Sequence, residues 1–313
     1  MNVAVGGTGF LGSQGTRFLV DLGGEGPVIH LAHANGFPPA TYEPLAAQLR
    51  SDYHLIGLPA RPLWPGSRPE SAPTWQPMAG DLIEALDGLA RSRAISLPII
   101  GVGHSLGGVL TLWAAIRRPD LFQAVILIDP VILPPRQLRV LRLMHLVSHL
   151  SGGLIGLHRH LPLVQATLRR RRTWPSRRAC RDHLAAKPFF AGWPTASLDA
   201  YVDSGTRERP DGQVELIYAP EWEAHIFATT PTDIWRYVPQ LHSPVLAIRG
   251  ERSPTFPAGS LARLARLLPQ ARTLTIADSD HMVPLERPVE TAEAIRSFVG
   301  ALAPRLDNTQ QRQ

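Results

Sequence analysis

Residues 99–108 read Ile99-Ile100-Gly101-Val102-Gly103-His104-Ser105-Leu106-Gly107-Gly108, an apolar run that ends in a glycine-rich turn. The apolar run predicts a buried strand, and the residues from Leu106 to Arg117 predict an apolar helix directly after it. The serine would then sit in a tight strand-to-helix turn. Glycines two residues before it and two residues after it allow backbone and helix to approach closely.

A serine hydroxyl is a poor nucleophile at neutral pH, and it needs a base beside it and a rigid, exposed position. The turn around Ser105 supplies the position. The bare pattern Gly-x-Ser-x-Gly is moderate evidence, because so short a pattern arises by chance, and the alternative is an idle serine in a glycine-rich turn. Its place between a buried strand and an apolar helix predicts that Ser105 is a nucleophile.

Around this stretch, apolar runs rich in β-branched residues alternate with helical patterns, which is typical of a mostly parallel sheet covered by helices. The predicted strands are Phe18–Leu22, Val28–His33, His54–Leu58, Pro98–Val102, Ala124–Asp129, Val245–Arg249 and Thr273–Ala277. The predicted helices are Tyr42–Leu49, Met78–Ala90, Leu106–Arg117, Ser260–Leu268 and Val289–Leu302.

The regular alternation stops between residues 131 and 237. This segment is rich in Arg, Pro, Trp and His, has helical periodicity in Leu138–Leu150, and lies between two predicted core strands. We interpret it as an inserted, mainly helical cap rather than a linker. The core would comprise residues 16–130 and 238–303, with flexible ends at 1–15 and 304–313.

With these elements in place, the chain resembles the α/β-hydrolase superfamily from about Thr16 to Leu302. The resemblance rests on the turn around Ser105 and on two further loops. The first is His33-Ala34-Asn35-Gly36-Phe37-Pro38-Pro39, where the superfamily places its oxyanion loop. The resemblance implies that the backbone N–H groups of Phe37 and Leu106 stabilise the oxyanion of a tetrahedral intermediate. Asn35, where many relatives carry a histidine, would hold the loop.

The second loop is Ala277-Asp278-Ser279-Asp280-His281-Met282-Val283-Pro284-Leu285-Glu286-Arg287-Pro288, between the last strand and the last helix. It is similar to the histidine loop of the superfamily. The resemblance implies that His281 takes the proton of Ser105 and later gives it to the leaving group. The order of serine early and histidine late is the order that the fold requires.

The acid that orients His281 is left open by the sequence. Most relatives place an aspartate a few residues past the glycine after the strand Val245–Arg249, whereas this chain reads Gly250-Glu251-Arg252-Ser253-Pro254-Thr255-Phe256. Some members supply the acid from the end of the strand that here ends in Asp129, although Asp-Pro there also occurs as a structural stop. We expect Asp129, with Glu251 as second choice and a different or absent acid as the remaining alternative.

The resemblance implies a cofactor-free, metal-free serine hydrolase, with a carboxylesterase as the expected activity. Lactone, peptide and carbon–carbon bond hydrolysis use the same three residues, and the fold does not choose among them. A serine at position 105 argues against haloalkane dehalogenases and epoxide hydrolases, which carry aspartate there. A non-catalytic binding protein on the same fold is the alternative from another class, because the common aspartate after Gly250 is missing.

Val5-Gly6-Gly7-Thr8-Gly9-Phe10-Leu11-Gly12 resembles the dinucleotide-binding turn of short-chain dehydrogenases. Only Met1–Val5 could form the strand that must precede it, and the next predicted strand ends in a loop better suited to an oxyanion. The Tyr-x-x-x-Lys pair of that family is impossible, because Lys187 is the only lysine and His183 lies four residues before it. We therefore expect no nicotinamide cofactor.

The 313 residues are 44% hydrophobic and 19% charged, the balance of a globular enzyme. The net charge of +6 is concentrated in Arg169-Arg170-Arg171-Arg172 and the arginines that follow, which could attract nucleic acid or acidic membranes. No nucleic-acid motif accompanies the run, so we interpret it as a solvated helix face. With Cys180 as the only cysteine, no signal peptide and no membrane span, we expect a cytoplasmic enzyme acting on a small ester-like molecule. The oligomeric state is left open.

Overall fold

A computed structural model describes residues 19–151 and 161–302 of the chain. A seven-stranded sheet in the order β1-β3-β2-β4-β5-β9-β10 lies at its centre. Its strands are β1 (Val20–Gly23), β2 (Val28–Ala32), β3 (His54–Gly57), β4 (Ile99–His104), β5 (Phe122–Ile128), β9 (Val245–Gly250) and β10 (Arg272–Ile276). The β1–β3 pair is antiparallel and the other pairs are parallel. The prediction of a mostly parallel sheet is confirmed.

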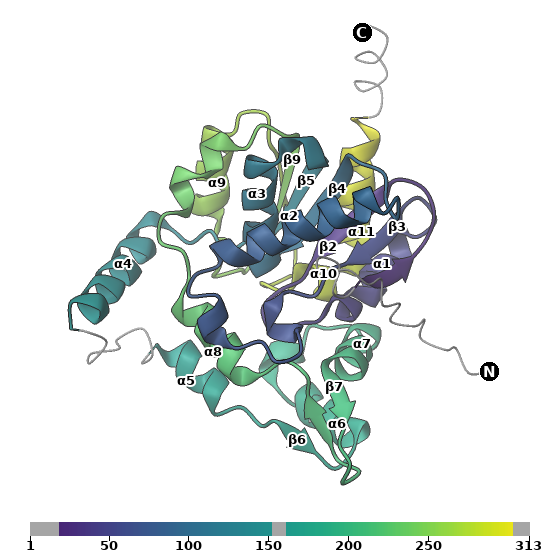
Figure 1. Cartoon of the computed structure of the whole chain (residues 1–313), viewed down its shortest axis with the longest axis vertical. Helices are drawn as coiled ribbons and strands as arrows, with labels where there is room; N and C mark the ends of the chain where they lie inside the picture. Colours follow the sequence, from purple (N-terminus) through teal and green to yellow (C-terminus); the bar gives the residue numbers. More distant parts are fainter. Residues whose placement is uncertain (1–18, 152–160, 303–313) are drawn as a thin grey trace, which may run out of the picture.

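Helices cover both faces of the sheet. Side chains of successive strand residues point to opposite faces, and both faces carry apolar residues that the helices bury. Ile29 and Leu31 of β2 pack in the apolar cluster that includes helices α1 (Glu43–Leu49) and α11 (Pro288–Gly300). Val28 packs in the other cluster, with α2 (Gln76–Arg91), α3 (Leu106–Arg117) and α9 (Ala258–Leu267), the helices in front of the sheet in Figure 1. Short helical turns connect the strands: α10 (Val283–Glu286), η1 (Pro39–Tyr42), η2 (Arg61–Leu63), η3 (Pro69–Ser71) and η4 (Pro119–Leu121).

The chain leaves the sheet after β5 and returns to it at β9. Between them lie α4 (Pro135–Leu150), α5 (Pro162–Leu168), α6 (Arg177–Ala185), α7 (Thr195–Gly205), α8 (Pro220–Ala228), η6 (Pro188–Phe190), η7 (Ile234–Arg236) and η8 (Val238–Gln240). A three-stranded antiparallel sheet of β6 (Thr173–Trp174), β8 (Val214–Leu216) and β7 (Thr206–Glu208) joins them. The predicted cap limits, 131 and 237, fall inside this insertion, and most of its elements gather at one end of the molecule (Figure 1). Sequence analysis did not anticipate the small sheet.

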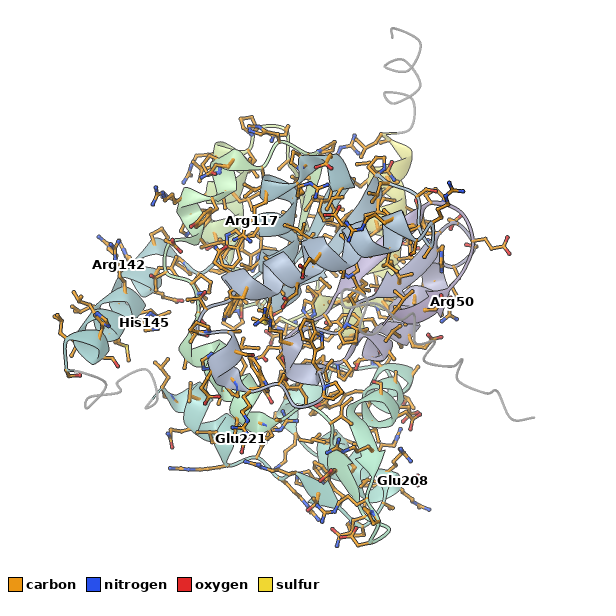
Figure 2. All side chains as sticks on the ribbon, in the orientation of Figure 1. Arg50, Arg117, Arg142, His145, Glu208 and Glu221 are labelled. Carbon is orange, nitrogen blue, oxygen red and sulfur yellow. The ribbon has the colours of Figure 1, made fainter. Side chains whose placement is uncertain are left out.

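The arginine run does not lie on a solvated helix face as predicted, because Arg169–Arg172 follows the end of α5, and several of its arginines pair with carboxylates. Arg170 pairs with Glu223, and Arg172 pairs with Glu221 at 2.5 Å. Arg177 pairs with Glu208 at 2.6 Å on the same outer surface, where Figure 2 labels Glu221 and Glu208. Within residues 19–151 and 161–302, no helix has the length and apolar character needed to cross a bilayer. The dinucleotide-like turn at 5–12 and both predicted flexible ends lie outside the described residues.

Candidate active site

Ser105 occupies the tight turn between β4 and α3, with the unusual backbone angles φ 56° and ψ −116°. The two flanking glycines are required by close backbone contacts. A Cβ atom on Gly103 would lie 2.4 Å from the carbonyl oxygen of Gly107, and one on Gly107 would lie 2.0 Å from that of Ala32. Any side chain at either position would push the strand and the helix apart, so the turn holds Ser105 at the end of β4 in one fixed orientation.

Three side chains form a hydrogen-bonded chain at this end of the sheet. The ring Nε2 of His281 lies 2.9 Å from Ser105 Oγ, and its Nδ1 lies 2.8 Å from Asp129 Oδ1. A carboxylate only accepts, so Nδ1 carries the proton and Nε2 accepts the serine O–H. Ser105 is buried, with 5% of its surface exposed, and so does not have the exposed position that the sequence predicted; Asp129 is fully buried. Sequence analysis named each of these residues, and the structure brings them together in the order that proton transfer requires.

Asp129 follows β5 directly, and both of its carboxylate oxygens are held. Oδ2 accepts the backbone N–H of Gly250 at 2.8 Å, and Oδ1 also accepts the hydroxyl of Ser253 at 2.5 Å. Glu251, the second candidate, points elsewhere: its Oε2 accepts the backbone N–H of Asp278 at 3.0 Å. Sequence analysis missed Ser253. The only signal for it was its place on the loop after Gly250, where relatives commonly carry the acid.

His104, next to Ser105, links the candidate site to the loop after β2. Its Nε2–H donates to the carbonyl oxygen of His281 at 2.9 Å, and its Nδ1 accepts the hydroxyl of Tyr42 at 2.6 Å. The Tyr42 oxygen in turn accepts the backbone N–H of Ala34 at 2.9 Å. Burial, aided by the nearby His281, lowers the pKa of His104 to about 3, so its ring is neutral at physiological pH. Sequence analysis did not identify Tyr42 or His104.

The loop after β2 is fixed by hydrogen bonds of its own side chains. His33 Nδ1–H donates to the carbonyl of Ala34 at 2.8 Å, and its Nε2 accepts the Ala60 N–H at 2.9 Å. Asn35 donates to the backbone carbonyl of Glu223 at 3.0 Å and accepts the Tyr218 hydroxyl at 2.9 Å. Asn35 therefore ties the loop to the insertion.

The two N–H groups expected to form an oxyanion hole differ in their present partners. Leu106 is the first residue of α3, so its N–H has no acceptor within that helix. The N–H of Phe37 donates to the carbonyl of Ala34 at 3.2 Å, across a turn in which Gly36 has φ 87°. For Phe37 to act as an oxyanion donor, its N–H must exchange this acceptor for the substrate oxygen.

Aromatic side chains of the insertion cover Phe37. Its ring centroid lies 4.8 Å from that of Tyr201 and 5.9 Å from that of Trp193. The Tyr201 hydroxyl accepts from Arg170 Nη2 at 2.9 Å, and Arg170 also pairs with Glu223, which is buried. Burial raises the pKa of Glu223, and the guanidinium of Arg170 opposes that rise. The insertion therefore packs directly against the loop after β2.

No cluster of His, Cys, Asp or Glu suited to a metal ion occurs within the described ranges, 19–151 and 161–302. His158 and His160, two histidines close in sequence, lie outside those ranges. The site at Ser105 brings together a hydroxyl, an imidazole, a carboxylate and backbone N–H groups, an arrangement suited to acyl transfer.

Comparison with known proteins found a matching family model and several relatives. Residues 31–294 match the model of the alpha/beta hydrolase family. A 2-(acetamidomethylene)succinate hydrolase of Mesorhizobium japonicum is 26% identical over 282 residues, covering 89% of this chain and 90% of the relative. A pimeloyl-[acyl-carrier protein] methyl ester esterase of Xanthomonas axonopodis pv. citri is 28% identical over 300 residues, covering 90% of this chain and 99% of the relative.

Solved structures share the same architecture. The crystal structure of E-2-(acetamidomethylene)succinate hydrolase superposes with a TM-score of 0.73 at 23% identity, covering 90% of this chain and 94% of that one. An esterase from Thermogutta terrifontis superposes with a TM-score of 0.61 at 20% identity, covering 91% of this chain and 93% of that one. At these identities the likeness concerns the fold, and it confirms the predicted arrangement of sheet and helices.

Proposed function

The chain belongs to the alpha/beta hydrolase family and is a hydrolase, and we propose that it cleaves carboxylic esters of small molecules through an acyl-enzyme on Ser105. The proposal rests on the chain of hydrogen bonds that runs from Ser105 through His281 to Asp129. The relatives support an ester as the substrate class, since one is named for a methyl ester.

In the first half-reaction, Ser105 Oγ attacks the ester carbonyl carbon, and its proton passes to Nε2 of His281. The ring then carries a positive charge, which the buried carboxylate of Asp129 stabilises at 2.8 Å. The N–H of Leu106 stabilises the oxyanion, joined by that of Phe37 once it releases Ala34. The intermediate collapses as the alcohol leaves with the proton from Nε2, and the acyl group remains on Ser105.

In the second half-reaction, water attacks the acyl-enzyme and gives a proton to the same Nε2. Collapse of the second intermediate releases the carboxylic acid and returns the proton to Ser105 Oγ. The net reaction consumes one ester and one water and produces one acid and one alcohol, with no redox step. The hydrogen bonds from Gly250 and Ser253 fix the carboxylate of Asp129 throughout, so the ring of His281 keeps one orientation.

A cytoplasmic location and the absence of a nucleic-acid partner are part of the same proposal. Cys180 is the only cysteine of the chain and is buried, so no disulfide within the chain calls for an oxidising compartment. The pairing of Arg170, Arg172 and Arg177 with carboxylates leaves less of the arginine run available to bind phosphates.

The proposal is tested with a fluorophosphonate probe and a series of p-nitrophenyl esters of increasing chain length, applied to wild type, Ser105→Ala and the control Ser51→Ala. Ser51 is exposed and its hydroxyl donates to Asp52 at 2.8 Å. We expect labelling and hydrolysis in wild type and control, and neither in Ser105→Ala. An unlabelled wild type would favour a binding protein, whereas labelling without ester turnover would move the substrate to a lactone, a peptide or a carbon–carbon bond.

A further inference from the structure

The helix α4, the first of the insertion, extends away from the central sheet (Figure 1) and exposes an apolar stripe. Nine large apolar side chains of the described residues are more than a third exposed, and four of them lie on α4. These four are Val140 (59%), Leu143 (60%), Leu146 (51%) and Leu150 (75%). Their spacing of three, three and four residues places them on one side of the helix. The exposed side of a surface helix is ordinarily polar, so this stripe indicates a surface that binds a partner.

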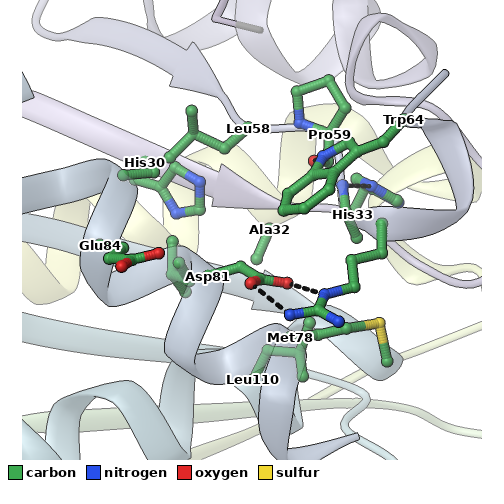
Figure 3. Close-up of a pocket in the computed structure, with 14 residues that line it drawn as sticks. His30, Ala32, His33, Leu58, Pro59, Trp64, Met78, Asp81, Glu84 and Leu110 are labelled. Atoms are coloured by element: carbon green, nitrogen blue, oxygen red, sulfur yellow. Dashed lines mark hydrogen bonds and ion pairs between the residues drawn. The ribbon is translucent and has the colours of Figure 1, made fainter. Parts of the chain in front are cut away.

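Arginines accompany the apolar stripe. Arg136, Arg139 and Arg142 of α4 are exposed, and Figure 2 labels the last of them. Each lies four residues before a member of the stripe, so the charged side chains border it on the helix surface. None of the three pairs with a carboxylate among the described residues. Arg61, by contrast, donates to Asp81 Oδ1 at 2.8 Å, a pair drawn in Figure 3. The charges of α4 are therefore available to negative groups outside the chain.

The sequence around α4 carries charge of one sign. No Asp or Glu occurs between Asp129 and Asp182, whereas the same stretch contains eleven arginines. A segment that is rich in arginine and free of acid attracts anionic partners and repels cationic ones. The partner of α4 must therefore offer negative charge, and beside it an apolar region that takes up the stripe.

We propose that α4 is a docking helix for a bilayer that contains anionic lipids. A bilayer offers both features at every point of its plane, because phosphates lie directly above hydrocarbon. The apolar stripe enters the hydrocarbon boundary, and the arginines of α4 extend their charged ends back to the phosphates. With 16 residues and three arginines, α4 lies in the plane of the interface. Nucleic acid would bind the arginines but leave the apolar stripe in water.

The test measures binding of the full chain to lipid vesicles by sedimentation. Every protein carries Ser105→Ala, so that phospholipid esters are not hydrolysed and the outcome does not depend on the proposed catalytic function. Vesicles of phosphatidylcholine alone are compared with vesicles of phosphatidylcholine mixed with phosphatidylglycerol. We expect binding to the anionic vesicles to be at least about tenfold tighter, and to weaken in high salt, which screens the charges of the arginines and the lipids.

The arginines are tested by Arg139→Gln/Arg142→Gln. This double variant should bind the anionic vesicles about thirtyfold more weakly, at about 1 kcal/mol for each arginine. The matched control, Arg91→Gln/Arg266→Gln, removes the same charge from exposed positions on α2 and α9. It should bind nearly as tightly as the Ser105→Ala protein.

The apolar stripe is tested by Leu143→Ser/Leu146→Ser. Binding to the anionic vesicles should weaken about tenfold or more, since a fully buried leucine is worth about 1.5–3 kcal/mol. The matched control, Leu274→Ser/Val289→Ser, removes two exposed apolar side chains outside the insertion and should leave binding unchanged. Melting temperatures check that all variants fold.

A second measurement needs no variant of α4. Anionic vesicles should slow hydrogen exchange of the backbone amides of α4 and leave those of α9 unchanged. The proposal is overturned if the protein binds neither kind of vesicle or both equally, or if the α4 variants bind as tightly as their controls. It is also overturned if the protein is a dimer in solution that Leu143→Ser/Leu146→Ser separates into monomers, because the apolar stripe then contacts a second copy of the chain.

Discussion

The carboxylate of Asp129 and the ring of His281 meet at 2.8 Å although 152 positions separate them in the sequence. The parallel pairing of β5 with β9 and of β9 with β10 brings them together, because it places the carboxyl ends of these strands at one edge of the sheet. Glu251 follows β9 at the same edge, yet its side chain accepts the N–H of Asp278. The geometry therefore favours an acid from the end of β5.

Replacing Asp129 by asparagine should lower kcat on an ester by 10²–10⁴, or roughly 3–5 kcal/mol of activation free energy, with KM little changed. An amide can donate to Nδ1 and so favours the wrong tautomer of His281. Turnover of a p-nitrophenyl ester measures the effect, and the melting temperature checks that the buried site still folds. Glu251→Gln is the matched control and should lower kcat far less. A larger loss in Glu251→Gln would move the acid to the loop after β9.

Tyr42→Phe should lower the free energy of unfolding by about 1–3 kcal/mol, since it leaves the Ala34 N–H without its acceptor and His104 Nδ1 without its donor. We also expect kcat to fall several-fold, because His104 supports the backbone of His281. Urea unfolding and ester kinetics measure the two effects. Tyr53→Phe is the control, because no hydrogen bond of the Tyr53 hydroxyl occurs among the described residues. Equal losses in both variants would show that the hydroxyl of Tyr42 has no special part.

The sequence predicts the strand-to-helix turn at Ser105 well, because the geometry of this turn depends on local contacts. Gly103 and Gly107 are required by backbone atoms only 2.0–2.4 Å from where a Cβ would lie, and such a requirement leaves a glycine pattern. His281 is similarly predictable, since it follows the last strand of an alternating pattern. The choice between Asp129 and Glu251 is not local. It depends on where two side chains at one sheet edge turn, which spacing does not encode.

Other parts of the site could not be predicted for the same reason. Tyr42 and His104 are 62 residues apart and meet only in the folded chain. The hydrogen bond from the Phe37 N–H to Ala34 depends on the conformation of the turn at Gly36. The small sheet of the insertion has strands of two or three residues, too short for a period of two to be recognised.

Trp193 and Trp222, two of the buried tryptophans of the insertion, should affect catalysis differently. Trp193 packs 5.9 Å from Phe37, whereas the indole N–H of Trp222 donates to Ser67 Oγ at 3.2 Å in the other apolar cluster. Trp193→Ala should therefore shift the preference toward longer acyl chains by about tenfold, since two additional buried methylenes at about 0.8 kcal/mol each are worth about that factor. Trp222→Ala should mainly lower stability. The ratio of kcat/KM for octanoate and acetate esters measures the shift, and an equal shift in both variants would contradict this assignment.

Stability should fall steeply in mild acid because three histidines are buried in their neutral form. Burial lowers the pKa of His30 to about 3, that of His33 to about 4 and that of His104 to about 3, from an ordinary value of 6.5. As the pH falls below 6.5, the unfolded chain binds protons at these rings and the folded chain does not. The free energy of unfolding therefore decreases from pH 6.5 down to about 4, by up to about 1.4 kcal/mol per pH unit for each ring.

Urea unfolding at half-unit steps from pH 7.5 to 4.5 measures this dependence. His30→Leu is the informative variant, because its ring makes no hydrogen bond among the described residues. Removing this ring should lower by about one the number of protons taken up on unfolding. The free energy of unfolding of the variant should therefore rise relative to that of wild type by about 1.4 kcal/mol for each pH unit below 6.5. His149→Gln, on the exposed face of α4, is the control, and its free energy of unfolding should change with pH as that of wild type does. If the free energy of unfolding of His30→Leu has the same pH dependence as that of wild type, then His30 either binds a proton in the folded state or is not buried as the structure has it.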